Sequence, residues 1–122
     1  MVNVLNWFEI PAADINRAEK FYSQILDVKM QSMDFGSLKM STFPMDGGGV
    51  SGALCQGEPY KPSQDGSLIY LNANPDLSAA LSKVEEAGGK ILMPKKQISE
   101  EYGFMSLIID SEGNRVALHS NK

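Results

Sequence analysis

The sequence predicts an α+β fold made of two copies of one strand–helix–three-strand unit. Segments with apolar residues at every second position indicate strands, and two segments with apolar residues at helical spacing indicate helices. The stretches "EIPAADINRA" and "LNANPDLSAA" also share one pattern, in which a strand end leads through an aspartate into an apolar residue and an alanine. We therefore expect a single domain over residues 1–122, with one unit in about 1–56 and the other in about 66–122.

The first unit opens with a strand in "VNVLNWFEI". Alternation places Val2, Phe8 and Ile10 on one face and Trp7 and Glu9 on the other. A helix follows in "AADINRAEKFYSQIL", where the carboxylate of the first aspartate can accept the unpaired amides of the first turn. Three short strands are expected in "VKMQSMD", "SLKMSTFPM" and "GVSGALCQ", because "FG" and "DGGG" supply turns between them.

The second unit begins after "GEPYKPSQDG", which is rich in proline, glycine and polar residues and is typical of a connecting loop. "SLIYLNA" predicts a strand, and "NPDLSAALSKVEEAGG" predicts a helix that Asp76 caps and Gly88 ends. The segments "KIL", "FMSLIID" and "NRVALHS" complete the unit as strands, with "DSEGN" as a turn between the last two. On the helices we expect Phe21, Tyr22, Leu81 and Val84 to be buried.

Composition excludes several classes of protein. An apolar fraction of 43% and a charged fraction of 21% are typical of a globular domain. The net charge of −4, with no basic cluster, argues against nucleic-acid binding, and no apolar run is long enough to cross a membrane. The segment "MVNVLNWFEI" lacks the features of a signal peptide, and Cys55 is the only cysteine, so we expect a cytoplasmic protein with Cys55 buried and inert.

Three segments together resemble the glyoxalase/bleomycin-resistance/dioxygenase group, also called the vicinal oxygen chelate superfamily. They are "FEIPAADINRAEKFYSQIL", "IYLNANPDLSAALSKVEEAGGKIL" and "GFMSLIIDSEGNRVALHS", in the order that the family uses. The resemblance implies paired βαβββ modules whose mixed sheets curl into a cup, with the helices on the outer faces. It also implies a homodimer.

Strand alternation predicts which side chains face this cup. If Phe8, Ile10 and their counterparts on the later strands pack on the helices, the residues between them point the other way. The predicted ligand-binding residues are Trp7, Glu9, Tyr70, Asn72 and His119. Such a mixture of apolar walls and a few converging polar groups is the usual form of a small-molecule site.

The resemblance also implies where a metal would be held. Carried over from metal-dependent relatives, the ligand positions fall at Trp7, near Leu68 and at Ala117, and none of these side chains can bind a metal. The equivalent strand of the first unit offers only Cys55 and Gln56 near the right place. Because even an open catalytic site needs about three protein ligands, we expect neither a metal nor another cofactor.

The polar residues of the predicted cup have alternative roles. His119, the only histidine, could recognise a ligand at the cup rim, act as a general base, or be a strand-end residue half in solvent. Glu9 has to be paired or lose its charge, and Asn72, His119 or Tyr70 could pair with it. Trp7 either fills the space of the absent metal or stacks on a flat ligand. We expect Glu9 and His119 to border one pocket.

These observations favour a protein that binds a small, partly apolar molecule in a metal-free cup. Two alternatives remain at this stage. One is a metal-dependent glyoxalase-, lyase- or dioxygenase-type enzyme, and the other is a dimeric interaction module with a filled cup. The expected partners are a small-molecule ligand and a second copy of the chain, without nucleic acid or membrane.

Overall fold

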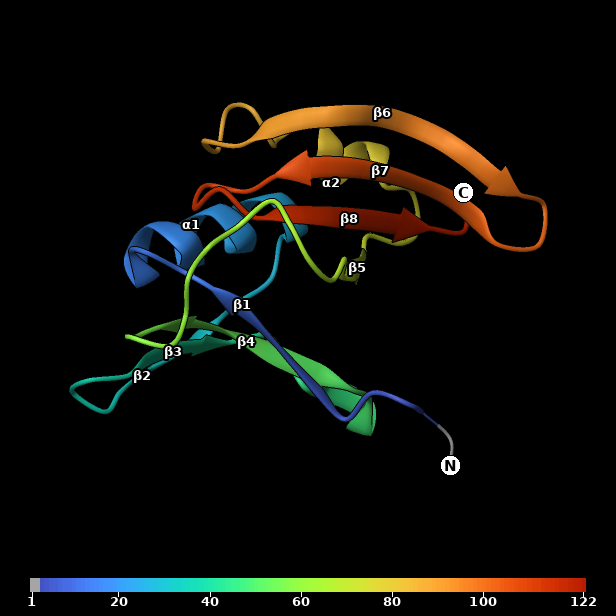
Figure 1. Ribbon diagram of the computed structural model, residues 1–122. Helices are drawn as coiled ribbons and strands as arrows, with labels where there is room; N and C mark the ends of the chain where they lie inside the picture. Colours follow the sequence, from blue (N-terminus) through green and yellow to red (C-terminus); the bar gives the residue numbers. More distant parts are fainter. Residues whose placement is uncertain (1–2) are drawn as a thin grey trace.

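The computed structural model describes residues 3–122, so Val2 lies outside the described residues (Figure 1). Two four-stranded mixed sheets and two α-helices make up the described part of the chain. The architecture is the predicted α+β fold of paired βαβββ modules. No helix within residues 3–122 is both long and apolar enough to span a membrane.

The first sheet has the strand order β1-β4-β3-β2. Its strands are β1 (Trp7–Pro11), β2 (Gln31–Asp34), β3 (Lys39–Thr42) and β4 (Ser51–Gln56). β1 is parallel to β4, and the other neighbours are antiparallel. Helix α1 (Ile15–Leu26) connects β1 to β2, and a short 3₁₀ helix, η1 (Asp46–Gly48), lies between β3 and β4. This is the strand–helix–three-strand order that the sequence predicts.

The second sheet repeats this plan with the order β5-β8-β7-β6. Its elements are β5 (Tyr70–Asn72), α2 (Ser78–Leu81), β6 (Lys90–Ser99), β7 (Gly103–Ile109) and β8 (Arg115–Ser120). The two units match at the level of single hydrogen bonds. Ala12 N donates to Cys55 O, and Ala73 N donates to His119 O, both at 2.8 Å. Cys55 and His119 therefore occupy equivalent places in the two units.

Helix α1 follows directly from its sequence. Asp14 accepts hydrogen bonds from the amides of Asn16 and Arg17, and Asp27 ends the helix in a left-handed conformation. The buried stripe is Ile15, Ala18, Phe21, Tyr22 and Ile25. Apolar residues at this spacing lie on one side of a helix, so α1 buries one face and exposes the other.

Two elements differ in length from the prediction. Helix α2 is only one turn long, because the chain after Leu81 continues in hydrogen-bonded turns. In one of these turns, Val84 N donates to Leu81 O. Val84 is still buried, whereas Leu81 is half-buried. Strand β6 extends far beyond the predicted "KIL", up to Ser99. Burial alternates from Lys90 to Lys96, but proline and lysine residues follow Met93, so the strand shows no apolar alternation in the sequence.

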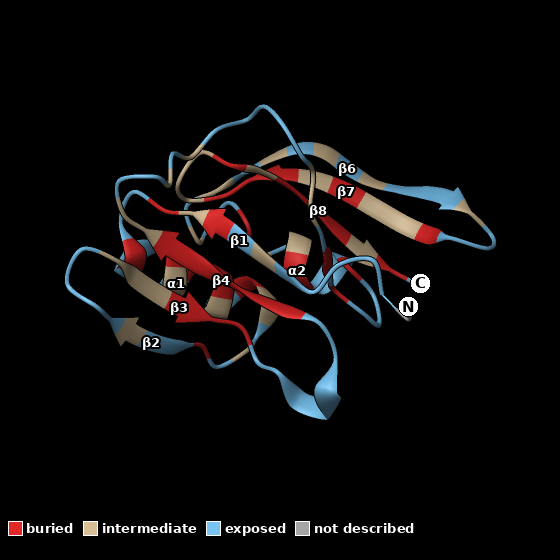
Figure 2. Ribbon diagram, turned by 60° about the horizontal axis from the view of Figure 1, so that its bottom comes forward, coloured by how far each residue is buried: buried red, intermediate tan, exposed pale blue. Residues whose placement is uncertain are grey.

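Both helices lie on the side where the two units meet (Figures 1 and 2). α1 contacts α2, and the buried apolar residues of both units form one core. Tyr22 shows the connection, because its ring lies 5.7 Å from that of Phe43 in the first unit and its hydroxyl donates to Asp110 of the second at 2.5 Å. Each sheet thus has a helix-bearing face turned to the shared core and a helix-free face on the outside.

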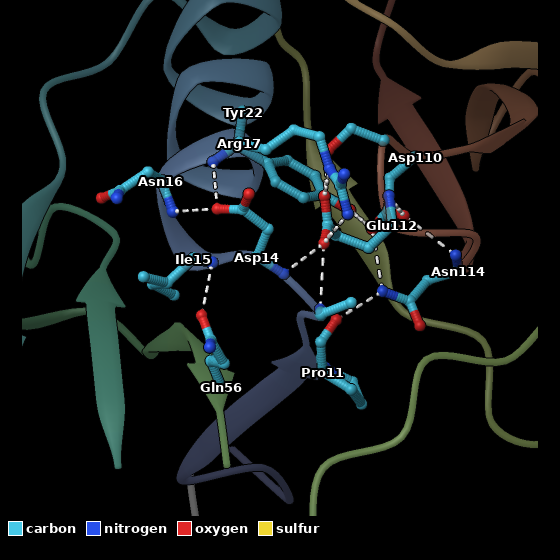
Figure 3. Close-up of polar contacts among 12 residues, drawn as sticks. Pro11, Asp14, Ile15, Asn16, Arg17, Tyr22, Gln56, Asp110, Glu112 and Asn114 are labelled. Atoms are coloured by element: carbon cyan, nitrogen blue, oxygen red, sulfur yellow. Dashed lines mark hydrogen bonds and ion pairs between the residues drawn. The ribbon is translucent and has the colours of Figure 1, made fainter. Parts of the chain in front are cut away.

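The turn "DSEGN" fastens the second unit to the start of α1 (Figure 3). Glu112 Oε1 accepts hydrogen bonds from the amides of Ala13 at 2.9 Å and Asp14 at 2.8 Å, and Glu112 Oε2 accepts one from Arg17 Nε at 2.7 Å. Asn114 Nδ2 donates to the carbonyl of Pro11 at 2.7 Å. The turn therefore has a structural role that holds the two units together.

Candidate functional site

The helix-free face of the first sheet carries Trp7 and Glu9. They point away from the core because Phe8 and Ile10, which alternate with them on β1, pack toward it. Trp7 Nε1 donates to Glu9 Oε2 at 3.4 Å, and the indole remains 37% exposed. The face thus combines an accessible aromatic ring with a carboxylate.

Tyr60 completes this group, and the sequence analysis missed it. Its hydroxyl donates to Glu9 Oε1 at 2.7 Å, so the linker between the units contributes to the site. The hydrogen bond to Glu9 raises the pKa of Tyr60 to about 12, and desolvation adds to the effect. The sequence holds only a weak signal for this role, which is a tyrosine inside an otherwise polar and proline-rich linker.

Cys55 lies near this group on β4. Its side chain is buried, as expected. Burial, followed by the negative charge of Glu9, raises the pKa of the Cys55 thiol to about 12. The thiol is therefore protonated near neutral pH, which makes it a poor nucleophile.

The helix-free face of the second sheet carries Tyr70, Asn72 and His119. Tyr70 is opposite Ala117 in the register between β5 and β8, and Asn72 is opposite His119. Tyr70 is 50% exposed, and His119 has Met105 of β7 as its other neighbour. Asn72 Oδ1 accepts hydrogen bonds from the backbone and the side chain of Asn74, which fixes the amide at the end of β5.

His119 has a defined tautomeric requirement. Its Nε2 lies 2.6 Å from the carbonyl oxygen of Tyr102 in the turn between β6 and β7. Because a carbonyl only accepts hydrogen bonds, Nε2 must carry a proton, and Nδ1 is the nitrogen left to accept one. His119 is half-buried, and this turn holds its ring in place. Nδ1 can therefore accept a hydrogen bond from a ligand or act as a general base.

Within one chain the two groups lie on different sheets. Trp7 and Glu9 belong to the first sheet, and Tyr70, Asn72 and His119 belong to the second. Within residues 3–122 the donors to Glu9 are Trp7 and Tyr60, in place of the expected Asn72, His119 or Tyr70. The physical reason is the shared core, because the helix-bearing faces pack together and leave the helix-free faces outside.

The positions that correspond to metal ligands do not supply suitable donors. Trp7 and Leu68 have no metal-binding group, and Ala117 is fully buried. The register puts Tyr70, two residues after Leu68, directly beside Ala117. Over the described residues 3–122, no three side chains of His, Cys, Asp or Glu are grouped closely enough to hold an ion. These residues do not fit a resident metal within one chain.

The fold and its paired helix-free faces define a class of protein, the double βαβββ domains. The profile of the glyoxalase/bleomycin resistance protein/dioxygenase superfamily matches residues 4–118. The chain therefore belongs to this superfamily. A glyoxylase-like domain-containing protein of Didymella fabae is 30% identical over 117 residues, which are 93% of this chain and 91% of that protein.

Solved structures show the same fold at low sequence identity. A glyoxalase I mutant from Zea mays is 18% identical with a TM-score of 0.72, and the match covers 96% of this chain but only 46% of the maize chain. The fosfomycin resistance protein FosX from Listeria monocytogenes is 15% identical with a TM-score of 0.69 and covers 100% of this chain and 94% of its own. A hypothetical protein from S. aureus is 19% identical with a TM-score of 0.66, covering 98% of both chains.

Proposed function

We propose that this protein binds a small, partly apolar molecule on its helix-free faces without a resident metal. In this proposal, Trp7 and Glu9 of one copy lie opposite Tyr70, Asn72 and His119 of a second copy. The first group offers an indole and an anchored carboxylate, and the second offers a phenol, an amide and an imidazole. The expected ligand has a flat or apolar body and at least one group that donates a hydrogen bond.

The observation that carries the proposal is the arrangement around Glu9. A carboxylate on an exposed sheet face would ordinarily be solvated, but here Tyr60 at 2.7 Å and Trp7 at 3.4 Å hold its two oxygens. Two donors fix the carboxylate in one orientation beside an accessible ring. Each carboxylate oxygen can accept a further hydrogen bond, so Glu9 remains able to accept one from a ligand.

A second copy is part of the proposal because each chain offers two incomplete halves. The helix-free faces lie outside the shared core, where they expose Trp7 and Tyr70 at 37% and 50%. A two-fold dimer uses the same pair of surfaces in both directions. If the first face of one copy meets the second face of the other, two equivalent sites form, and both aromatic side chains are covered.

The donor set is the reason to prefer a metal-free site over a metal-dependent enzyme. Two of the solved structures bear the names glyoxalase I and fosfomycin resistance protein. Their identities to this chain are 18% and 15%, so the similarity supports the fold alone. The chemistry has to be inferred from the residues of this chain. Trp7 and Ala117 stand at the inferred ligand positions, and neither donates to a metal.

Trp7 is the only tryptophan, which makes its fluorescence a direct test. A thermal-shift screen of small metabolites and antibiotics identifies candidate ligands, because a ligand that binds only the native state raises its stability. A true ligand should change Trp7 emission saturably, and His119→Ala should weaken its binding without loss of fold. Lys83→Ala, which changes a residue just after α2 and outside the proposed site, is the matched control. A ligand that binds equally well to Trp7→Phe, Glu9→Gln and His119→Ala would refute the proposal.

A further inference from the structure

A small cavity lies where the linker between the two units crosses β1 and the start of β8. Its volume is about 160 Å³. Trp7, Tyr70, Asn72 and His119 are not among the residues that line it, and Glu9 is the one member of the proposed ligand site that is. The cavity therefore lies at the seam of the two units and shares only Glu9 with the proposed ligand site.

Arg115 is the distinctive residue of this cavity. Its Nη2 donates to the carbonyl of Gly66 at 3.0 Å, which points the guanidinium toward the linker. Its Nε is shielded from solvent and has no hydrogen-bond partner in the described part of the chain. Neither of the ion pairs within residues 3–122 involves Arg115. A half-buried guanidinium without an anionic partner lacks the compensation that buried charges normally have.

The acidic residues of the lining do not provide that partner. Glu9 lines the cavity and accepts hydrogen bonds from Tyr60 and Trp7, and it forms no ion pair with Arg115. Asp65 is exposed on the linker and forms no ion pair with Arg115. A second cation, Lys61, lines the cavity as well. Neither cation forms an ion pair within residues 3–122, and of the two Arg115 is half-buried whereas Lys61 is exposed.

The remaining walls are partly apolar. Pro11, Ile69 and Val116 line the cavity beside the charged groups. A planar guanidinium matches the two oxygens of a carboxylate, and apolar walls favour a ligand with a carbon chain over an inorganic oxyanion. We propose that this cavity binds a short-chain carboxylate, whose carboxylate pairs with the Arg115 guanidinium and whose carbon chain packs on Pro11, Ile69 and Val116.

Titration of nitrogen-15-labelled protein with butyrate, acetate, inorganic phosphate and chloride at matched ionic strength tests the proposal. We expect saturable shifts of the Arg115 and Ser67 amide signals with butyrate, and weaker binding of acetate because it has less carbon chain to bury. Phosphate should bind more weakly than butyrate, and chloride should give no saturable shift. Equal responses to butyrate and chloride, or tighter binding of phosphate than of butyrate, would overturn the proposal.

Variants identify the residue responsible. Arg115→Gln should weaken butyrate binding by about ten-fold or more, the loss expected for a charge-assisted hydrogen bond. Arg115→Lys keeps the charge but loses the planar pair of donors, so its affinity for butyrate should lie between those of the wild type and Arg115→Gln. Lys90→Gln, which removes an exposed charge from β6, should not change butyrate binding. If Arg115→Gln does not fold, the butyrate affinities of Arg115→Lys and Lys61→Gln test the proposal instead. Butyrate binding that is unchanged in both variants refutes the site. His119→Ala should leave butyrate binding unchanged, because His119 does not line this cavity, which separates this test from that of the proposed function.

Discussion

At the scale of single residues, the linker residue Tyr60 holds Glu9 of β1, because its hydroxyl donates to the carboxylate at 2.7 Å. Alternation correctly assigned Trp7 and Glu9 to the face of β1 that does not pack on the core. It could not predict that Tyr60 holds Glu9, because a linker has no periodic pattern and its contacts depend on where the chain folds back. The contact from His119 to the carbonyl of Tyr102 was hidden for the same reason.

The pairing of Tyr60 with Glu9 makes a testable prediction about ionisation. Removing the carboxylate in Glu9→Gln should lower the pKa of Tyr60 from about 12 toward its usual value of 10.0. A raised pKa means that this contact stabilises the fold below the unfolded-state pKa, and that the stabilisation disappears as the pH rises toward 12. Tyrosine NMR titration measures the shift. Glu58→Gln, which removes an exposed carboxylate from the same linker, is the control. A Tyr60 pKa that stays near 12 in Glu9→Gln would show that Glu9 is not the cause of the raised pKa.

At the scale of elements, the start of α1 depends on a residue from the other unit. The side chain of Glu112 has no exposed surface and accepts hydrogen bonds from two backbone amides and from Arg17. The sequence predicted the "DSEGN" turn and the Asp14 cap, but it could not show that the turn caps a helix in the other half of the chain. Local patterns predict elements, whereas contacts between units are a property of the folded chain.

Glu112→Gln should destabilise the protein by roughly 1.5–3 kcal/mol at neutral pH, the range for hydrogen bonds to charged groups. Burial raises the pKa of Glu112, but the hydrogen bonds from Arg17, the Asp14 amide and Ser111, together with the charge of Arg17, outweigh burial and hold it below the usual 4.5. The ionised form therefore stabilises the fold above 4.5, and this is lost as the pH falls through the lower folded-state pKa.

Urea unfolding of the wild type and Glu112→Gln at neutral and acidic pH measures this difference. The gap in free energy of unfolding should narrow as the pH falls from 4.5 toward the lower folded-state pKa of Glu112. Glu85→Gln, which changes an exposed residue after α2, should show no gap at either pH. A gap that stays constant through the acidic range would mean that the charge of Glu112 does not contribute.

At the scale of the whole molecule, the duplication was predictable and the packing of the two units was not. The repeated strand–helix start and the order of the elements along both units follow from the sequence. Glu9 and His119 lie on different sheets of one chain, so the expectation that they border one pocket stays a prediction that involves a second copy. Apolar faces of α1 and of both sheets show which surfaces are buried, but the pattern alone does not say whether they bury against their own unit or the other one.

The proposed absence of a resident metal predicts the metal content of the purified protein. Because Trp7, Leu68 and Ala117 stand at the inferred ligand positions, protein purified without chelator should hold no stoichiometric nickel, zinc, iron or manganese. Elemental analysis measures this directly. About one tightly bound ion per chain would show that donors such as Glu9 and His119, brought together by two copies, form a site after all.

The most direct test of the two-copy site is whether Glu9 of one copy lies close to His119 of a second copy. The double variant Glu9→Cys/His119→Cys, treated with a short bismaleimide, should give covalent dimers on a denaturing gel. Glu9→Cys mixed with His119→Cys should give the same product, while Glu58→Cys mixed with His119→Cys should give much less. Cys55 is buried and should react little. If the double variant instead forms a cross-link within a monomer, one chain alone brings the two residues together, and the two-copy site is wrong.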